Sequence, residues 1–487
     1  MKDDMRVPKS LLVIGNGFDL SCDLPSNYLS FLTSILSSKI NSKESEVIEI
    51  IKQGIRNYIE KSEHFWIDSP QQLTTITADN NRFILDLNIW YLLFVYKDMI
   101  HDINWYLIED QIASELLGDH NNLNIVEKIG DTLLGIYRGE EGYVGRKDRL
   151  YCRTKTNTYD EENLIDKIYE LFAYCLLHKN LDSLENNNNK GVFQELRIAV
   201  QSLGDEYKEY LKISPQGKID SSPYLEIFEH KITSVLFPLV ARALLAELNE
   251  LEGDFLKYLN LCIKTLKLSK IPYIENAKLY FRNILESVND NRGYRDMVDF
   301  NILSFNYTTP WETPNNENYT TSWKTPNNEI FEKVFDSINI HGQISNHDGI
   351  IFGIDDEKIS PTQNEFIFSK VARTLDLITL STHRKNFEEL LLPSIENVVF
   401  YGHSLSIADY GYFRMIFDKY VKNSEVKFYF TFKVYKGTTA DKERKKLVKS
   451  ISEIFGKYSI DKEKNTDIFK NLIQNQRIKI IPLKINI

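Results

Sequence analysis

Short apolar runs that end at glycine or polar residues stand near both ends of the chain. Leu11–Ile14 stops at Gly15-Asn16-Gly17, which predicts a buried strand entering a tight turn, with a helix following from about Asn27. Similar runs return after residue 295. They are Phe300–Phe305, Ser337–Ile340, Ile350–Phe352, Val398–Tyr401, Val426–Val434 and Ile478–Ile485. Because helical patterns separate several of them, the two ends together favour an α/β sheet.

Between about residues 45 and 295 the apolar residues recur mainly at helical spacing. One helix is expected after the acidic start Asp160-Glu161-Glu162. A longer helix is expected over Leu239–Leu268, with a break near Gly253. The polar stretch Glu185–Gly191 predicts a loop between helices.

The predicted architecture is therefore a discontinuous α/β domain, residues 1–45 and 295–487, with a Rossmann-like and mostly parallel sheet flanked by helices. Residues 46–294 are expected to form a large helical insertion, since connections inside a compact domain are usually short. A near-repeat, Trp311–Glu317 and Trp323–Glu329, is interpreted as a duplicated loop or hairpin.

Composition and charge narrow the class of protein. With 59 basic and 69 acidic residues the net charge is −10, which is unlike a dedicated DNA-coating protein. The four cysteines form no C-x-x-C pair, so zinc-ribbon spacing is absent and a reducing cytoplasm is the expected location. The start, MKDDMRVPKS, lacks the apolar core of a signal peptide. No membrane span is expected, because Ile89–Tyr96 is too short and Val235–Leu248 is short and contains Arg242.

Three motifs stand where strands are predicted to end. Gly15–Asp19 follows the first strand, and such a turn can bring backbone amides close to a phosphate, or can simply turn the chain. Asn306 follows the second run and can bind a ribose or a water, or cap the next turn. His341 ends a third run and can serve as a general base, or can be structural.

A fourth motif follows Val398–Tyr401, as Gly402-His403-Ser404-Leu405-Ser406 with Asp409 downstream. It resembles the nucleophile turn of serine hydrolases, but His403 is the last histidine of the chain and the usual order needs a later one. A backbone turn that meets a nucleotide is the favoured interpretation.

Taken together, the motifs resemble the AbiH family of bacterial phage abortive-infection proteins. The resemblance rests on several matches spread along the chain. They are Ile14–Leu20 with Leu24-Pro25, then Trp105 and Glu109, Ser304–Tyr307, His341-Gly342, Gly402–Leu405 and Asp409. Residues 120–290 add little to it.

AbiH-like proteins in turn are distantly similar to the sirtuin-type NAD-binding fold. The positions that match are Gly15, Gly17, Pro25, Asn306, Tyr307, His341, Gly342, Gly402, Ser404 and Leu405. Asp19, Thr308 and His403 depart from the sirtuin pattern, and the zinc module has no counterpart. Losing the acid at Thr308 disfavours lysine deacylation more than it disfavours nucleotide binding.

This resemblance implies a site that cleaves the nicotinamide–ribose bond of NAD, with NAD or a related nucleotide as substrate or ligand and with no prosthetic group or metal. Asn306 and His341 would be catalytic. The nucleotide would be held by Gly15, Asn16, Gly17, Phe18, Asp19, Tyr307, Gly402, His403, Ser404 and Asp409. Within this set, Gly15 and Gly17 would hold the pyrophosphate, and Asp19 would bind the ribose or cap the first helix.

A phage-encoded trigger and self-association are the partners that this function implies. The helical insertion, residues 46–294, would act as a sensor, a lid or an oligomerisation surface. Two alternatives stay open. One is a nucleotide sensor without turnover that signals through the helical region. The other, less favoured, is a nucleic-acid effector that uses the basic stretches Arg146–Lys155 and Lys433–Lys449. The sequence offers it no convincing metal-binding carboxylates, since Asp355-Asp356 fits a turn best.

Overall fold

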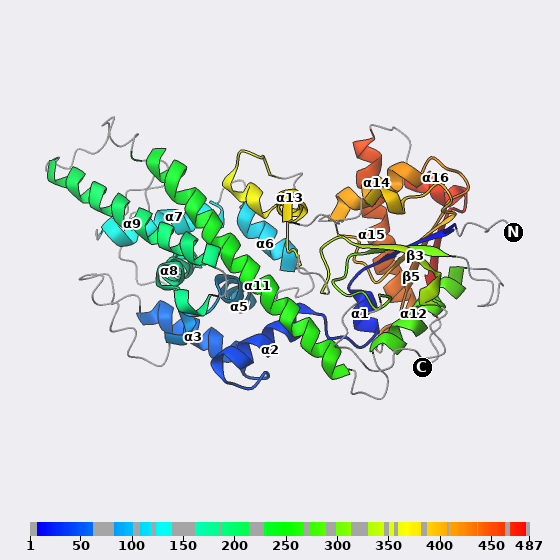
Figure 1. Ribbon diagram of the computed structural model, residues 1–487, viewed down its shortest axis with the longest axis horizontal. Helices are drawn as coiled ribbons and strands as arrows, with labels where there is room; N and C mark the ends of the chain where they lie inside the picture. The colour runs from blue at the N-terminus through cyan, green and yellow to red at the C-terminus, as the bar shows by residue number, and fades with distance from the viewer. Residues whose placement is uncertain are drawn as a thin grey trace. The chain divides into compact units, whose positions relative to one another are not determined.

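A computed structural model of the chain is drawn in Figure 1. It describes residues 7–61, 82–100, 108–118, 123–138, 161–184, 187–213, 228, 230–266, 273–288, 299–312, 330–344, 350–354, 359–380, 387–406, 409–435, 437–462 and 468–483. The basic stretch 146–155, Trp105, the pair Asp355-Asp356 and nearly all of the Trp311–Glu329 near-repeat lie outside these residues.

The chain divides into two compact units. Unit 1 comprises Met1–Phe31, Phe255–Asp355 and Thr374–Ile487, and unit 2 comprises Leu32–Asp254 and Asp356–Arg373. Three helices run through the division points: α2 (Tyr28–Ile40), α11 (Phe237–Leu266) and α13 (Lys370–Leu380). The sequence predicted domain boundaries near residues 45 and 295. These differ from the division into compact units and remain a prediction.

Unit 1 contains a parallel sheet that, in the described residues, has six strands in the order β3-β2-β1-β4-β5-β6. The strands are β1 (Ser10–Ile14), β2 (Phe300–Ser304), β3 (Val334–Asn339), β4 (Asn397–Tyr401), β5 (Lys427–Phe432) and β6 (Ile478–Pro482). Every neighbouring pair is parallel. This is a Rossmann-like order, and it confirms the predicted α/β fold class.

One predicted strand is wrong. Of the run Ile350–Phe352, only Ile350 pairs, in an isolated antiparallel bridge with Gly342. The run is apolar because Ile350, Ile351 and Phe352 are buried side chains, not because a ladder of backbone hydrogen bonds holds them. Burial alone gives a strand-like pattern in so short a run.

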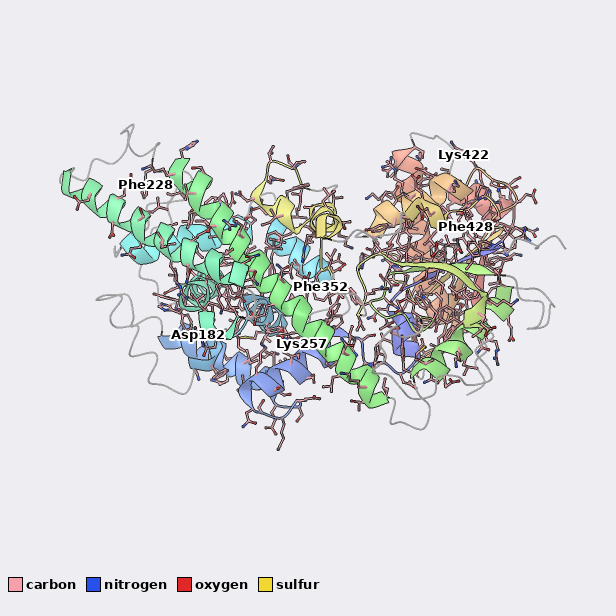
Figure 2. The ribbon with its side chains drawn as sticks, in the orientation of Figure 1. Asp182, Phe228, Lys257, Phe352, Lys422 and Phe428 are labelled. Atoms are coloured by element: carbon pink, nitrogen blue, oxygen red, sulfur yellow. The ribbon has the colours of Figure 1, made fainter. Side chains whose placement is uncertain are left out.

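Both faces of the sheet are covered, which explains why its strands are continuous apolar runs. On one face, Val13, Val398 and Phe428 share a core with α14 (Tyr410–Tyr420) and α15 (Ala440–Asp461). Phe428, labelled in Figure 2, is fully buried there. On the other face, α12 (Tyr273–Val288) packs Phe281 against Phe300 of β2, with ring centroids 6.1 Å apart. A short helix, α16 (Ile468–Gln474), precedes β6.

Unit 2 is built from helices. They are α3 (Val47–Lys61), α5 (Ile89–Ile100), α6 (Ile108–Leu117), α7 (Ile125–Arg138), α8 (Glu161–His178), α9 (Asn187–Ile213) and the first part of α11. The helix expected after Asp160 is confirmed as α8. Two other expectations are wrong. Helix α11 continues through Gly253, and α9 begins at Asn187 inside the predicted polar loop.

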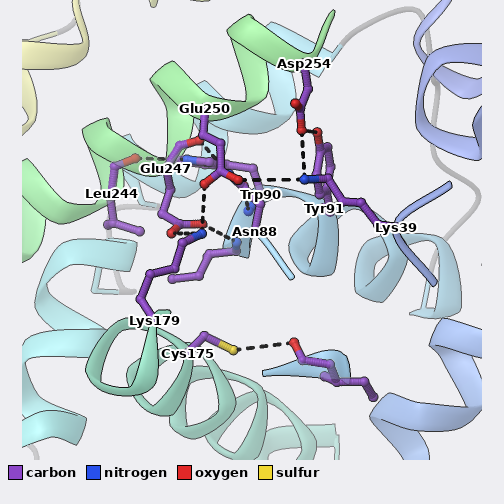
Figure 3. A network of polar contacts seen from close by, with 12 residues as sticks. Lys39, Asn88, Trp90, Tyr91, Cys175, Lys179, Leu244, Glu247, Glu250 and Asp254 are labelled. Carbon is purple, nitrogen blue, oxygen red and sulfur yellow. Dashed lines mark hydrogen bonds and ion pairs between the residues drawn. The ribbon is translucent and has the colours of Figure 1, made fainter. Parts of the chain in front are cut away.

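A buried ion-pair network joins helices in the core of unit 2 (Figure 3). The Nζ of Lys179 lies 2.6 Å from Glu247 and 2.8 Å from Glu250. The Glu247 carboxylate also accepts the backbone N–H of Ile89, and the Asn88 amide donates to the Glu247 carbonyl. Burial alone would lower the pKa of Lys179, but the two carboxylates raise it above its usual value. The lysine, which directly follows α8, therefore stays charged and pairs with two carboxylates of α11, and Glu247 links this pair to the start of α5.

One described stretch, Ile232–Leu266, is long and apolar enough to cross a membrane by length and composition alone. More than half of its most apolar window is buried within the fold, as in the core helix of a folded domain.

Candidate functional site

The predicted site residues follow four adjacent strands of the unit 1 sheet. Gly15–Asp19 follow β1, Asn306 follows β2, His341 follows β3 and Gly402–Asp409 follow β4. In the order β3-β2-β1-β4, the connections after β1 and β4 lead to opposite sides of the β1–β4 pair. This is the switch point of the sheet, where open α/β sheets bind their ligands.

The turns after β1 and β4 touch through their glycines. The backbone N–H groups of Gly15 and Gly17 donate to the carbonyls of Tyr401 (3.1 Å) and Gly402 (2.7 Å). A Cβ on Gly17 would lie 2.8 Å from the Cα of Gly402, and one on Gly15 would lie 2.6 Å from the Cα of His403. These glycines therefore have a structural role, the close approach of two backbones, while their contact with a pyrophosphate stays a prediction.

Asp19 lies buried in a small network of oxygen atoms. The hydroxyl of Tyr273 donates to its Oδ1 (2.7 Å), and the hydroxyl of Thr308 lies 2.8 Å from its Oδ2. The two hydroxyl oxygens are themselves 2.8 Å apart. The hydroxyl of Thr308 also lies 2.9 Å from Oδ1 of Asp19, so both hydroxyl groups donate toward the carboxylate.

Burial raises the pKa of Asp19 to about 6. The hydrogen bonds from Tyr273 and Thr308 and the nearby Asn306 amide act in the opposite direction and favour the ionised form. Asp19 also makes no side-chain cap at α1 (Gly17–Ser21), whose N-cap is Asn16. A carboxyl group that titrates near neutrality is thus built into the turn after β1.

Asn306 is buried but has an unused amide. It lies close enough to Asp19 to favour the carboxylate. Even so, no contact with good hydrogen-bond geometry reaches its Oδ1 or Nδ2 from the described residues. Asn339 holds the same turn in place, since its Nδ2 donates to the carbonyls of Asn306 (2.7 Å) and Thr308 (3.1 Å). Burying an unpaired polar group costs about 1–3 kcal/mol, a cost that a ligand with matching groups removes.

His341 and His403 share one carboxylate. The Nε2 of His341 lies 3.3 Å from Oδ1 of Asp409, and the Nε2 of His403 lies 3.3 Å from its Oδ2. The contact of His341 lacks good hydrogen-bond geometry, so it is an approach of charges and its Nε2 has no hydrogen-bond partner among the described residues. The side chains of all three are largely buried, at most 10% exposed. The Nδ1 of His403 accepts the backbone N–H of Leu405 at 2.8 Å. In the neutral ring the proton of His403 therefore sits on Nε2, facing Asp409.

Aromatic side chains fix the two imidazoles. The ring of Phe305 lies 4.3 Å from that of His403 and 5.7 Å from that of His341. Phe413 packs edge-on against His403 at 5.0 Å, and Tyr307 lies 6.4 Å from His341. Tyr307, proposed from the sequence to meet the nucleotide, thus borders the histidine that ends β3.

The other predicted residues make ordinary packing, hydrogen-bond or ion-pair contacts, or are exposed. Ser404 is exposed, and Phe18 packs on Phe281 at 4.8 Å. Asn16 exchanges hydrogen bonds with Ser26. Glu109 lies in unit 2, where it pairs with Lys370 at 3.3 Å.

Several basic residues on α15 pair with acidic residues of the same helix. Lys445 pairs with Asp441, Lys446 with Glu443, and Lys449 with Glu453. Paired charges of alternating sign make a weak surface for the phosphates of a nucleic acid.

Sequence reasoning missed two members of the site. Tyr273 begins α12, far along the chain from Asp19, and no local pattern marks it. Asn339 stands two residues before His341 in the strand that led to it, and a polar residue at the end of a buried strand was the available signal. Thr308 was noted only as a departure from the sirtuin pattern, whereas it donates to Asp19.

Metal binding finds no support in the described part of the chain, where no group of three or more His, Cys, Asp or Glu side chains could hold an ion.

These features define a Rossmann-like α/β protein with a polar site at the switch point of its sheet and a helical second unit. The sequence profile described as Bacteriophage abortive infection AbiH matches residues 11–211 and 254–431, most of the chain. The chain belongs to the AbiH family, and its function lies in phage abortive infection. This confirms the family predicted from the motifs. No curated protein and no solved structure matches the chain.

Proposed function

We propose that the switch-point site hydrolyses NAD at the nicotinamide–ribose bond during phage infection. The observation that carries the proposal is the approach of His341 to the carboxylate of Asp409 (3.3 Å), beside a buried Asn306. The amide of Asn306 and the Nε2 of His341 have no hydrogen-bond partner among the described residues. A base held by a carboxylate and an unpaired amide are two groups that a ribose-cleaving site needs. The sirtuin-like matches at Asn306 and His341 support the same chemistry.

In the proposed reaction the glycosidic electron pair leaves with nicotinamide, and positive charge develops on the ribose. His341 takes a proton from a ribose hydroxyl, and the negative charge on that oxygen offsets the positive charge. Water then adds to the anomeric carbon and releases its proton, and His341 returns the first proton to the hydroxyl. The products are nicotinamide, ADP-ribose and one proton.

Asn306 orients the ribose or the attacking water through its amide. Asp19 lies near this amide and accepts hydrogen bonds from Tyr273 and Thr308. The proposal gives Asp19 a supporting role, because its carboxylate is already occupied by two hydroxyl groups. The amides of Gly15 and Gly17 donate within the protein, so they support the turn and leave pyrophosphate binding to other groups.

The test is NAD turnover by the purified chain, with nicotinamide and ADP-ribose measured by mass spectrometry in the presence of lysate from phage-infected cells. Wild type should release both products, and H341A and N306A should lose about 10²–10⁴-fold in rate. Asn471→Ala, on the exposed side of α16, and His230→Ala, exposed in unit 2, are the matched controls. Binding of NAD without turnover would instead support the nucleotide sensor.

A further inference from the structure

We infer that Asp409 is a positioning residue for His341, not a nucleotide ligand, and that His403 holds Asp409 in the orientation this requires. The effect of Asp409 on catalysis rests on the proposed function. Its effect on the tautomer of His341 does not depend on that function. The inference begins from the bridging of two imidazoles by a single carboxylate, at 3.3 Å on each side.

Asp409 stands at the N-cap of α14, where an aspartate usually accepts a hydrogen bond from the first turn of its helix. No such side-chain cap is present. The Asp409 carboxylate therefore does not stabilise the start of α14 by capping. It lies toward His341 and His403 instead.

The orientation is fixed from the His403 side. The N–H of Leu405 occupies Nδ1 of His403, so the neutral ring presents an N–H from Nε2 to Oδ2 of Asp409. Phe305 and Phe413 pack against that ring, at 4.3 and 5.0 Å, and restrict its rotation. With Oδ2 held, Oδ1 of Asp409 faces Nε2 of His341.

This arrangement selects one tautomer of His341. Nε2 of His341 makes no contact with good hydrogen-bond geometry in the described residues, but it faces a carboxylate oxygen 3.3 Å away. The negative charge of that oxygen favours the tautomer with the proton on Nε2, which leaves the lone pair that serves as the base on Nδ1. When Nδ1 takes a proton, the carboxylate stabilises the resulting imidazolium without becoming protonated. This is the role that an orienting acid has beside a catalytic histidine.

Asp409→Asn separates this role from the alternatives. The amide has one acceptor and one donor, and His403 must keep its proton on Nε2 because Leu405 occupies Nδ1. The amide oxygen therefore faces His403, and the NH₂ group faces His341. His341 must then accept at Nε2 and carry its proton on Nδ1, so the lone pair is lost from the position of the base.

The experiment is long-range ¹H–¹⁵N correlation on ¹⁵N-histidine-labelled full chain, with His341 and His403 assigned by substitution. We expect the neutral His341 to carry its proton on Nε2 in wild type and on Nδ1 in D409N, with His403 on Nε2 in both. The unchanged His403 shows that D409N is folded. The same His341 tautomer in both proteins overturns the inference.

Kinetics with NAD give the second readout. D409N should lower kcat by about 10²–10⁴-fold with KM nearly unchanged, because orientation of the base is lost and nucleotide contacts are kept. A raised KM with unchanged kcat would overturn the inference and restore a nucleotide-binding role. Asp418→Asn, on the same helix but paired with Lys462, is the control and should change neither readout. If wild type does not turn over NAD, the proposed function fails, while the tautomer measurement still decides the role of Asp409.

Discussion

Gly17 donates its backbone N–H to the carbonyl of Gly402 across 2.7 Å, although the two glycines lie near opposite ends of the chain. The contact joins the turn that carries Asp19 to the turn that carries His403. Neither glycine can bear a side chain there, and Gly402 also has a positive φ of 69°. The site is thus assembled by backbone packing between β1 and β4 before any ligand takes part.

Gly402→Ala should destabilise unit 1. Its Cβ would lie 2.4 Å from the backbone nitrogen of Phe18, and alanine at this φ is strained in addition. We expect a loss of at least about 2 kcal/mol, which should appear as a more than tenfold loss of hydrogen-exchange protection in β1 and β4.

The control for that substitution is Gly456→Ala. Gly456 lies inside α15, and a Cβ there meets nothing within 4 Å. Alanine should stabilise this helix by about 0.5–1 kcal/mol. Equal protection in G402A and G456A would contradict the close-approach role of Gly402.

Asp19 should make the stability of unit 1 depend on pH. Folding raises the pKa of this carboxyl to about 6, so between about pH 4 and pH 6 the folded chain binds its proton more tightly than the unfolded chain. Its contribution to the free energy of unfolding is therefore favourable at low pH and falls as the pH rises through that window. Above pH 6 the buried carboxylate is a net cost.

Asp19→Asn imitates the protonated form and removes this slope. Relative to wild type, D19N should gain about 1 kcal/mol in free energy of unfolding between pH 5 and pH 7.5, measured by urea denaturation. Asp23→Asn, an exposed neighbour on the same loop, is the control. A difference between D19N and wild type that does not change with pH would show that Asp19 titrates at its ordinary pKa.

The sheet was predictable because its strands are buried on both faces. β1, β2, β4 and β5 appear in the sequence as apolar runs bounded by glycine or polar residues, and each prediction lies within a few residues of the observed strand. The ends of the helices were harder to predict from the sequence. Asn187 to Gly191 suggested a loop by composition, yet they form the first turns of α9, because local propensity is only a weak guide to structure.

The site was predictable only where local chemistry marks it. His341 and Asn306 stand at strand ends, so their placement followed from the strands themselves. The Tyr273–Asp19 hydrogen bond joins residues separated by Leu32–Asp254, the larger part of unit 2, and no spacing rule connects them. The shared carboxylate of Asp409 is likewise a tertiary relationship, since sequence offered only an aspartate downstream of His403.

Lys179→Met should destabilise unit 2 strongly. The substitution leaves the carboxylate of Glu247, whose side chain is 1% exposed, without its partner. Removing one member of a buried ion pair costs about 3–5 kcal/mol. Hydrogen exchange in α8 and α11 should report the loss.

Lys39→Met is the matched control in the same network. Lys39 pairs with Asp254 at 3.1 Å, but its side chain is one-third exposed. Its loss should cost about 1 kcal/mol or less. A similar effect of K39M and K179M would contradict the view that burial makes the Lys179 pair structural.

The most direct test of the central claim is the NAD content of phage-challenged cells that express wild type, H341A, N306A or the Asn471→Ala control. The account predicts that NAD falls and nicotinamide and ADP-ribose rise after infection with wild type and N471A, and that H341A and N306A lose both this response and phage protection. Phage protection by wild type with unchanged NAD would contradict it.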